Sequence, residues 1–230
     1  MEAAALVTTL AADHCHSLTP ALIDLGCGTG SLAGALPHHF TYLGIDVQPW
    51  LVDHARRSHP QAEFATGDLL EYRAGHPFEM IVCLGNTLAY LHTDDELTSA
   101  CETFAAHADV GTLLVVGTLI TPPRVGRSEQ TVSVPGGLAD VTIETAWNPS
   151  TYTATTVRTW NLPDGSTRTD CLVRRVHDLD ALDQAMTRAG FSVVEKFDRV
   201  DDRGKTVTGP SAIVVARATE AFRRHAPSAR

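Results

Sequence analysis

The chain has 230 residues, of which 43% are hydrophobic and 20% charged, as in a globular protein of one domain with a small elaboration. Its 27 acidic and 18 basic side chains give a formal charge of -9, which disfavours a nucleic-acid partner because phosphate backbones are also negative. No apolar run is long enough to span a membrane and the first residues lack the basic start of a secretory signal, so we expect a cytoplasmic protein.

Short apolar runs alternate with helical patterns over the first 118 residues. A helix over residues 3–16 precedes a strand at 21–25, and further strands are expected at 41–45, 62–66, 78–84 and 112–116. Helices are expected to begin at Ser31, at Pro49 and after Thr93, where Glu96 completes a capping box. This alternation predicts an α/β fold with a doubly wound, Rossmann-like, mostly parallel sheet that has helices on both faces.

The pattern changes after residue 126. Residues 127–176 are rich in Thr and Val with period-2 alternation, and Pro163-Asp164-Gly165-Ser166 is typical of a turn between two strands. We therefore expect an antiparallel β extension after the fifth strand. A helix capped by Asp178 and ended by Gly190 follows, and strands at 191–195 and 211–215 bring the main sheet to about seven strands.

Cysteine and histidine usage predicts neither a disulfide framework nor a metal centre. The five cysteines are odd in number and form no C-x-x-C pair, which fits reduced thiols. In His14-Cys15-His16, adjacent side chains on a helix point in different directions, so we expect no metal ion there. Arg223 and Arg224 belong to a predicted tail over residues 218–230.

A glycine-rich loop, Asp24-Leu25-Gly26-Cys27-Gly28-Thr29-Gly30, follows the first predicted strand. Its glycines leave backbone N–H groups open to a ligand, although a plain strand-to-helix turn is the alternative. A dinucleotide fingerprint would need a glycine where Ser31 stands. Asp24 fits a cationic group, such as the ammonium of a methionine moiety, better than a pyrophosphate. The cofactor-binding residues expected here are Asp24, Gly26, Cys27, Gly28 and Gly30.

Two further acidic residues end neighbouring strands. Asp46 closes the second strand, 20 positions after Gly26, where a carboxylate accepts hydrogen bonds from ribose hydroxyls. Asp68 follows the third strand and can accept from an adenine amino group, while Leu69 packs on the ring. Taken alone, Asp46 could be a helix N-terminal acid and Asp68 a turn residue. Val47 is expected to contact the same cofactor.

The segment from Cys83 to His92 follows the fourth strand and must face the reacting group, because ligands bind outside the carboxyl ends of parallel strands. We expect Leu84 to contact the cofactor and Asn86 and Tyr90 to contact the substrate. Tyr90 and His92 are the candidate catalytic residues; their alternatives are core packing for Tyr90 and a surface position for His92. Trp160, in the β extension, is a candidate substrate contact whose alternative is core packing.

Together, Asp24 to Gly30, Asp46, Gly67-Asp68 and Gly85-Asn86-Thr87 resemble class I S-adenosylmethionine-dependent methyltransferases in residue type, order and spacing. Within that class, Gly85 to Leu91 and the β extension are most similar to bacterial small-molecule N-methyltransferases, of the amino-sugar N,N-dimethyltransferase and glycine N-methyltransferase types. The resemblance implies S-adenosylmethionine as cofactor and an amine nitrogen of a small molecule in natural-product biosynthesis as methyl acceptor.

The resemblance also divides the chain. It implies a cofactor-binding core over residues 1–126, the β extension over 127–176 on the substrate side or at an oligomer contact, and closing elements of the core over 177–217. A homodimer through the extension is expected. Members of the family usually begin with a helical segment whose tyrosines cover the cofactor, and residues 1–20 contain no tyrosine. The site is therefore expected to be more open, or to have a lid from elsewhere.

Catalysis in this class depends mainly on proximity and alignment, which contribute about 7–11 kcal/mol. A general base would add about 10²–10⁴-fold, and the sugar enzymes are expected to carry a histidine near the place of Tyr90, which leaves the base open. The alternatives are O-methylation, another use of the same cofactor, and a non-catalytic cofactor-binding partner subunit. Ser31 and the lack of a recognisable Lys/Tyr pair argue against a nicotinamide oxidoreductase.

Overall fold

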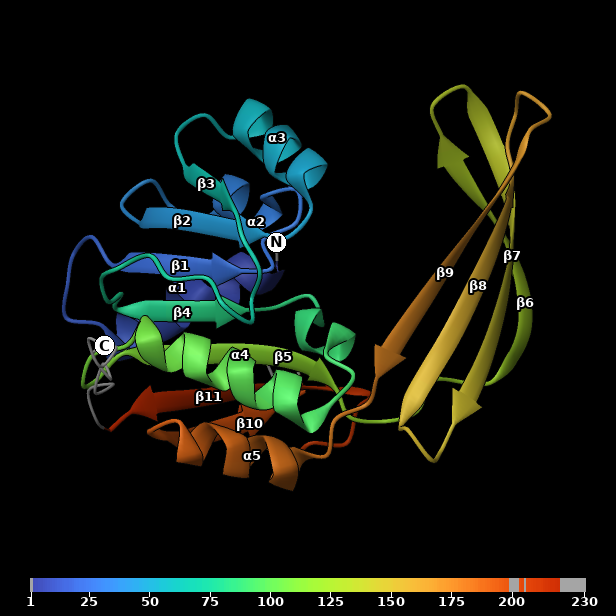
Figure 1. Cartoon of the computed structure of the whole chain (residues 1–230). Helices are drawn as coiled ribbons and strands as arrows, with labels where there is room; N and C mark the ends of the chain where they lie inside the picture. Colours follow the sequence, from blue (N-terminus) through green and yellow to red (C-terminus); the bar gives the residue numbers. More distant parts are fainter. Residues whose placement is uncertain (1, 199–202, 205, 220–230) are drawn as a thin grey trace, which may run out of the picture.

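A helix-flanked sheet forms the body of the protein, and a second, smaller sheet projects from one end of it (Figure 1). The computed structural model describes residues 2–198, 203–204 and 206–219. Of the predicted tail over residues 218–230, Ala218 ends strand β11 (Ser211–Ala218), and residues 220–230, with Arg223 and Arg224, lie outside the described residues.

The main sheet has seven strands in the order β10-β11-β5-β4-β1-β2-β3. The strands β1 to β5 are parallel, and β11 runs antiparallel to both β5 and β10. The predicted mostly parallel sheet of about seven strands is confirmed, with its antiparallel pairs at one end. The strands span Ala21–Leu25 (β1), Thr41–Asp46 (β2), Glu63–Thr66 (β3), Met80–Cys83 (β4), Leu113–Leu119 (β5), Phe191–Phe197 (β10) and Ser211–Ala218 (β11).

Helices cover both faces of this sheet because its central strands are apolar on both sides; every residue of β4 is buried. On one face, Leu10 of α1 and Val52 of α3 share a core with Leu22 and Val82. On the other, residues of α4 and α5 pack over the opposite side of the same strands. The helices span Glu2–His14 (α1), Ser31–Ala35 (α2), Pro49–Ser58 (α3), Asp94–Ala106 (α4) and Leu179–Arg188 (α5).

The predicted starts of α4 and α5 are confirmed by their capping contacts. Thr93 Oγ1 accepts a hydrogen bond from the Glu96 N–H at 3.1 Å, and Glu96 Oε2 accepts from the Thr93 N–H at 2.9 Å, which completes the capping box of α4. Asp178 Oδ1 accepts from the Ala181 N–H at 2.9 Å and caps α5. These local contacts fix where both helices begin.

The second sheet is the antiparallel extension, with strands in the order β6-β7-β8-β9. It leaves the core after β5 and returns just before α5, so it stands beyond the carboxyl ends of the parallel strands (Figure 1). Side chains alternate between its faces, and the pairing of Trp160 with Arg168 puts Trp160 and Leu172 on the same face. Its strands span Gly126–Val134 (β6), Gly137–Asn148 (β7), Thr153–Asn161 (β8) and Thr167–Arg175 (β9).

Candidate active site

A cavity of about 780 Å³ opens where β1, β2 and β3 end. This edge is where a doubly wound sheet binds ligands, because the loops that leave neighbouring strands diverge there. Its walls also include residues of the 3-10 helix η1 (Thr87–Tyr90), of α3 and of β9. The predicted site residues that the structure brings together in this cavity are Gly26, Asp46, Val47, Asp68, Leu69 and Tyr90.

Gly26 in the glycine loop approaches its neighbours too closely for a side chain. Gly26 has a φ of 88°, and its N–H donates to the Ile45 carbonyl at 2.7 Å. A Cβ on Gly26 would overlap the side chain of Thr87 at the start of η1. Gly26 is therefore required both for its left-handed backbone and for the approach of η1. The result is bare backbone on the cavity wall.

Asp46 ties the glycine loop to the start of α3. Its Oδ2 accepts a hydrogen bond from the Gly28 N–H and its Oδ1 from the Gln48 N–H, both at 2.9 Å. Each carboxylate oxygen has a second lone pair, so the group can accept two more hydrogen bonds from a ligand. A fixed carboxylate with spare acceptor capacity fits a vicinal diol.

Asp68 and Leu69 follow β3 on the next wall. Asp68 Oδ1 accepts from the Leu70 N–H at 2.8 Å, and its carbonyl accepts from the Tyr72 N–H at 2.8 Å, so the turn is rigid. Leu69 is partly buried against the core. An acidic acceptor beside an apolar side chain suits a heteroaromatic base that carries an amino group.

Asp24 is not among the residues that line the cavity. It is buried and accepts a hydrogen bond from Tyr42 Oη at 2.6 Å. Burial raises the pKa of the Asp24 carboxyl to about 7; the hydrogen bond from Tyr42 opposes this rise and the Asp46 charge adds to it. Burial likewise raises the pKa of the Cys27 thiol, which stays protonated.

We expect Asp24→Asn to change the stability of the ligand-free protein in a pH-dependent way. A raised carboxyl pKa gives stability that is fully present below the unfolded value and is lost as the pH rises through about 7. Between pH 5 and pH 8, wild type should therefore lose about 2–3 kcal/mol relative to the variant, which cannot ionise. Denaturant unfolding of both proteins at the two pH values measures this, and a pH-independent difference would contradict it.

Of the residues predicted in the segment after β4, only some lie on the cavity wall. Tyr90 is about half exposed (52%) and lines the cavity. His92 is not among the described residues that line it, and His92 Nε2 lies 3.1 Å from the Val173 carbonyl of β9. Asn86 also lies off the cavity wall and has a left-handed φ of 63° at the start of η1. Leu84 packs against the α1 side of the core.

Trp160 lies elsewhere, in a second cavity of about 810 Å³ on the extension. Trp160 Nε1 donates to Asp170 Oδ2 at 2.9 Å, and Asp170 Oδ1 accepts from Arg158 Nε at 2.7 Å. The Arg158 guanidinium carbon stands 5.5 Å from the centre of the indole ring. The structure therefore separates Trp160 from the cavity that holds Asp46 and Tyr90.

Several residues that line the cavity were given no role from the sequence, among them Trp50, Leu51 and Leu172. Trp50 follows Asp46 closely, and an aromatic residue in the first turn of the helix after a strand-ending acid is a signal present in the sequence. Its side chain is 66% exposed in the structure. Leu172 comes from β9, and nothing in the local sequence marks it.

Within the described ranges, no three His, Cys, Asp or Glu residues gather to hold a metal ion. No helix there is long and apolar enough to cross a bilayer.

Residues 22–110 match the sequence profile of the methyltransferase domain family. A curated relative, a dTDP-3-amino-3,4,6-trideoxy-alpha-D-glucopyranose N,N-dimethyltransferase from Streptomyces venezuelae, is 34% identical over 113 residues, which is 46% of this chain and 46% of the relative. The chain thus matches less than half the length of its curated relatives.

Solved structures match the fold over nearly the whole chain. An S-adenosylmethionine-dependent methyltransferase from Clostridium acetobutylicum has a TM-score of 0.81 at 13% identity and covers 93% of this chain and 89% of its own. An amino pentose methyltransferase from Micromonospora echinaspora, solved with S-adenosylmethionine bound, has a TM-score of 0.78 at 21% identity and covers 95% and 90%. The fold is therefore that of S-adenosylmethionine-dependent methyltransferases.

Proposed function

We propose that this chain, whose residues 22–110 match the methyltransferase domain family, binds S-adenosylmethionine and methylates an amine nitrogen of a small molecule. The observation that carries the proposal is the convergence of bare Gly26 backbone, the Asp46 carboxylate and Asp68 in one cavity at the carboxyl edge of the sheet. When bound, the cofactor supplies a methyl group made electrophilic by its sulfonium sulfur.

Each wall of the cavity fits one part of that cofactor. We assign Asp46 to the ribose hydroxyls, Val47, Asp68 and Leu69 to the adenine, and the Gly26–Gly30 loop to the amino-acid end. We assign buried Asp24 to the charge of the amino-acid end, because a ligand ammonium nearby would favour the ionised form of its carboxyl group. Cys27 and Leu84 support this side through packing.

Tyr90 is the proposed acceptor contact and the candidate proton acceptor. It shares the cavity with the cofactor residues and is exposed enough to meet a substrate. For His92, whose Nε2 donates to the Val173 carbonyl, the predicted role as a base falls to Nδ1. A neutral amine needs little help from a base, so alignment by the cavity walls is the main contribution.

The proposed acceptor is an amino sugar carried on a nucleotide. The curated relatives are named as N,N-dimethyltransferases of amino sugars, two of them with a 3-amino and one with a 4-amino group. Trp160 pairs with Arg168 and shares a sheet face with Leu172. The four residue steps from Arg168 to Leu172 span about 13 Å, so a long acceptor would reach both cavities. The formal charge of -9 also supports a small-molecule acceptor over a nucleic acid.

We expect S-adenosylhomocysteine, the demethylated product, to stabilise the protein. At 100 times its dissociation constant it should add about 2.7 kcal/mol to the free energy of unfolding, and NAD at the same concentration should add nothing. Thermal unfolding with each ligand measures this. Methyl transfer to the three dTDP-amino sugars, followed by mass spectrometry, then tests the acceptor class. Binding without transfer to any of them would contradict the proposed acceptor and favour a non-catalytic subunit.

The extension is the proposed dimer contact. It projects from the core, and Leu138 and Tyr152 on it are 67% and 59% exposed. Light scattering should give twice the chain mass of 24.7 kDa, and Leu138→Lys should return the monomer. A wild-type monomer would refute this contact.

A cytoplasmic location stays a prediction. The five free thiols support a reducing compartment, and cell fractionation tests the location.

A further inference from the structure

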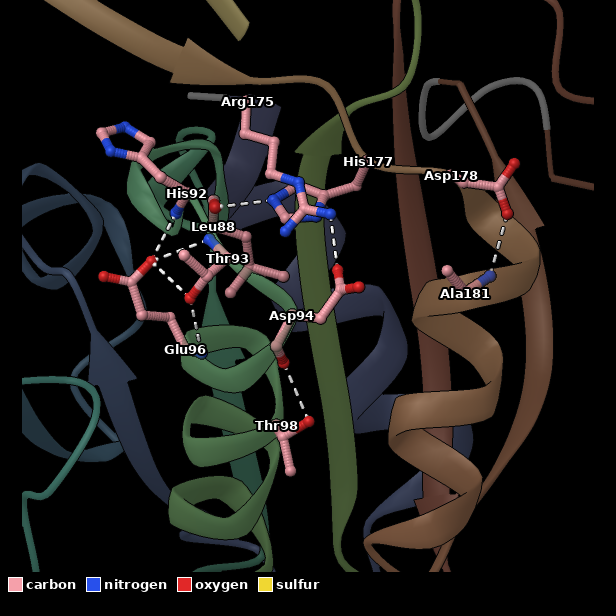
Figure 2. Close-up of polar contacts among 10 residues, drawn as sticks. All are labelled: Leu88, His92, Thr93, Asp94, Glu96, Thr98, Arg175, His177, Asp178 and Ala181. Atoms are coloured by element: carbon pink, nitrogen blue, oxygen red, sulfur yellow. Dashed lines mark hydrogen bonds and ion pairs between the residues drawn. The ribbon is translucent and has the colours of Figure 1, made fainter. Parts of the chain in front are cut away.

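Three polar contacts join the end of β9 and the residues after it to the segment that carries Tyr90 and the start of α4. Figure 2 shows two of them, those of Arg175 and His177. His92 Nε2 lies 3.1 Å from the Val173 carbonyl, and Arg175 Nη2 lies 2.5 Å from Asp94 Oδ1. His177 Nε2 lies 2.8 Å from the Leu88 carbonyl. We call these six residues the clasp: Val173, Arg175 and His177 on the extension side, and Leu88, His92 and Asp94 on the core side.

The centre of the clasp is shielded from water. His177 is only 3% exposed, and the Arg175 side chain is 18% exposed. Burial lowers the pKa of His177, so its ring is neutral at physiological pH and donates from Nε2 to the Leu88 carbonyl. The backbone N–H of His177 also donates to the Leu119 carbonyl of β5 at 2.8 Å. One buried residue thus connects the extension, η1 and the main sheet.

The residues next to the clasp form one side of the cavity. Tyr90 and Leu91 lie between Leu88 and His92 in the chain, and Leu172 directly precedes Val173. The clasp sets the position of Tyr90 and Leu91 relative to Leu172, because apart from the clasp only packing connects η1 to β9 in the part of the chain that the structure describes.

The cofactor side of the cavity has its own support. Asp46 is held by the N–H groups of Gly28 and Gln48. Thr87, which faces Gly26, is held by a hydrogen bond from its Oγ1 to the Leu84 carbonyl at 2.8 Å. None of these three hydrogen bonds involves a clasp residue, so the two sides of the cavity are fixed by separate sets of bonds.

We propose that the clasp positions the acceptor side of the cavity, and that His177 and Arg175 are positioning residues for acceptor recognition that leave cofactor affinity unchanged. This inference rests on the proposed function, because it assumes that the cavity binds a methyl acceptor. Its structural part, that His177 and Arg175 order residues 86–92, does not depend on that function. The extension then contributes to the acceptor side of the site, in addition to projecting from the core.

The test compares His177→Leu with His177→Gln, because a glutamine amide can still donate to the Leu88 carbonyl. We expect His177→Leu to speed hydrogen exchange in residues 86–92 about tenfold, and His177→Gln to restore wild-type protection. The KM for the best dTDP-amino sugar should rise about tenfold in His177→Leu, while the dissociation constant of S-adenosylhomocysteine stays within about twofold. Calorimetry measures the latter.

Arg175→Gln is the second variant, should His177→Leu not fold. It breaks the ion pair with Asp94 and should raise exchange and KM in the same direction. Arg127→Gln is its matched control, because Arg127 pairs with Glu129 on the outer strand of the same sheet and should change neither. Equal losses of acceptor and cofactor affinity, unchanged exchange in residues 86–92, or no rescue by glutamine would each overturn the proposal.

Failure of the proposed function gives a different pattern. If wild type binds S-adenosylhomocysteine and methylates none of the amino sugars, the acceptor class is wrong. The exchange and calorimetry readouts need no acceptor, so they still decide whether the clasp orders residues 86–92 independently of the cofactor.

Discussion

Gly26→Ala should weaken the binding of S-adenosylhomocysteine by about 100-fold or more and lower the free energy of unfolding by about 1–3 kcal/mol. Two effects add. The residue has a φ of 88°, where an alanine is strained, and the new Cβ would overlap the Thr87 side chain. Calorimetry with the ligand and denaturant unfolding without it measure the two losses separately.

Two further variants separate the overlap from the strain. Gly26→Ala with Thr87→Ala removes the overlap and should recover part of the stability, since only the backbone strain remains. Gly28→Ala has a φ of 55° and no atom within 4 Å of its new Cβ in the ligand-free protein, so it should lose only about 1–2 kcal/mol of stability. Wild-type ligand affinity in Gly26→Ala would remove the glycine loop from the site.

Asp46→Asn should weaken S-adenosylhomocysteine about 100-fold or more, because hydrogen bonds to a charged acceptor contribute about 1.5–3 kcal/mol each and two ribose hydroxyls are involved. The amide also places a donor where the carboxylate accepts from the N–H groups of Gly28 and Gln48. Calorimetry measures the affinity, and unfolding of the ligand-free variant measures the cost of these two bonds.

A ligand that lacks a ribose hydroxyl tests whether this loss of affinity comes from the contact between Asp46 and the ribose. For the 2′-deoxy analogue of S-adenosylhomocysteine, the penalty of Asp46→Asn should shrink, since one of the affected bonds is already missing. Asp53→Asn is the control, because Asp53 is an exposed acid on the following helix, α3, and pairs with Arg56. An equal penalty for both ligands would mean that Asp46 acts only on the loop.

The sequence determined the elements and the cofactor side of the site. Strand and helix patterns depend on residues a few positions apart, as in the capping box of Thr93 and Glu96. The glycine loop and the acids Asp46 and Asp68 each end a strand, and parallel strands must present their carboxyl ends at one edge. Topology alone therefore brings Gly26, Asp46 and Asp68 together.

Only the tertiary structure decided the acceptor side. Leu172 reaches the cavity, Trp160 lies in a separate one, and His92 contacts the Val173 carbonyl, 81 positions away. Such contacts depend on the register of the extension and on how it meets the core, which no local pattern encodes. The burial of Asp24 against Tyr42 is of the same kind, since a carboxyl pKa is set by the packing around it.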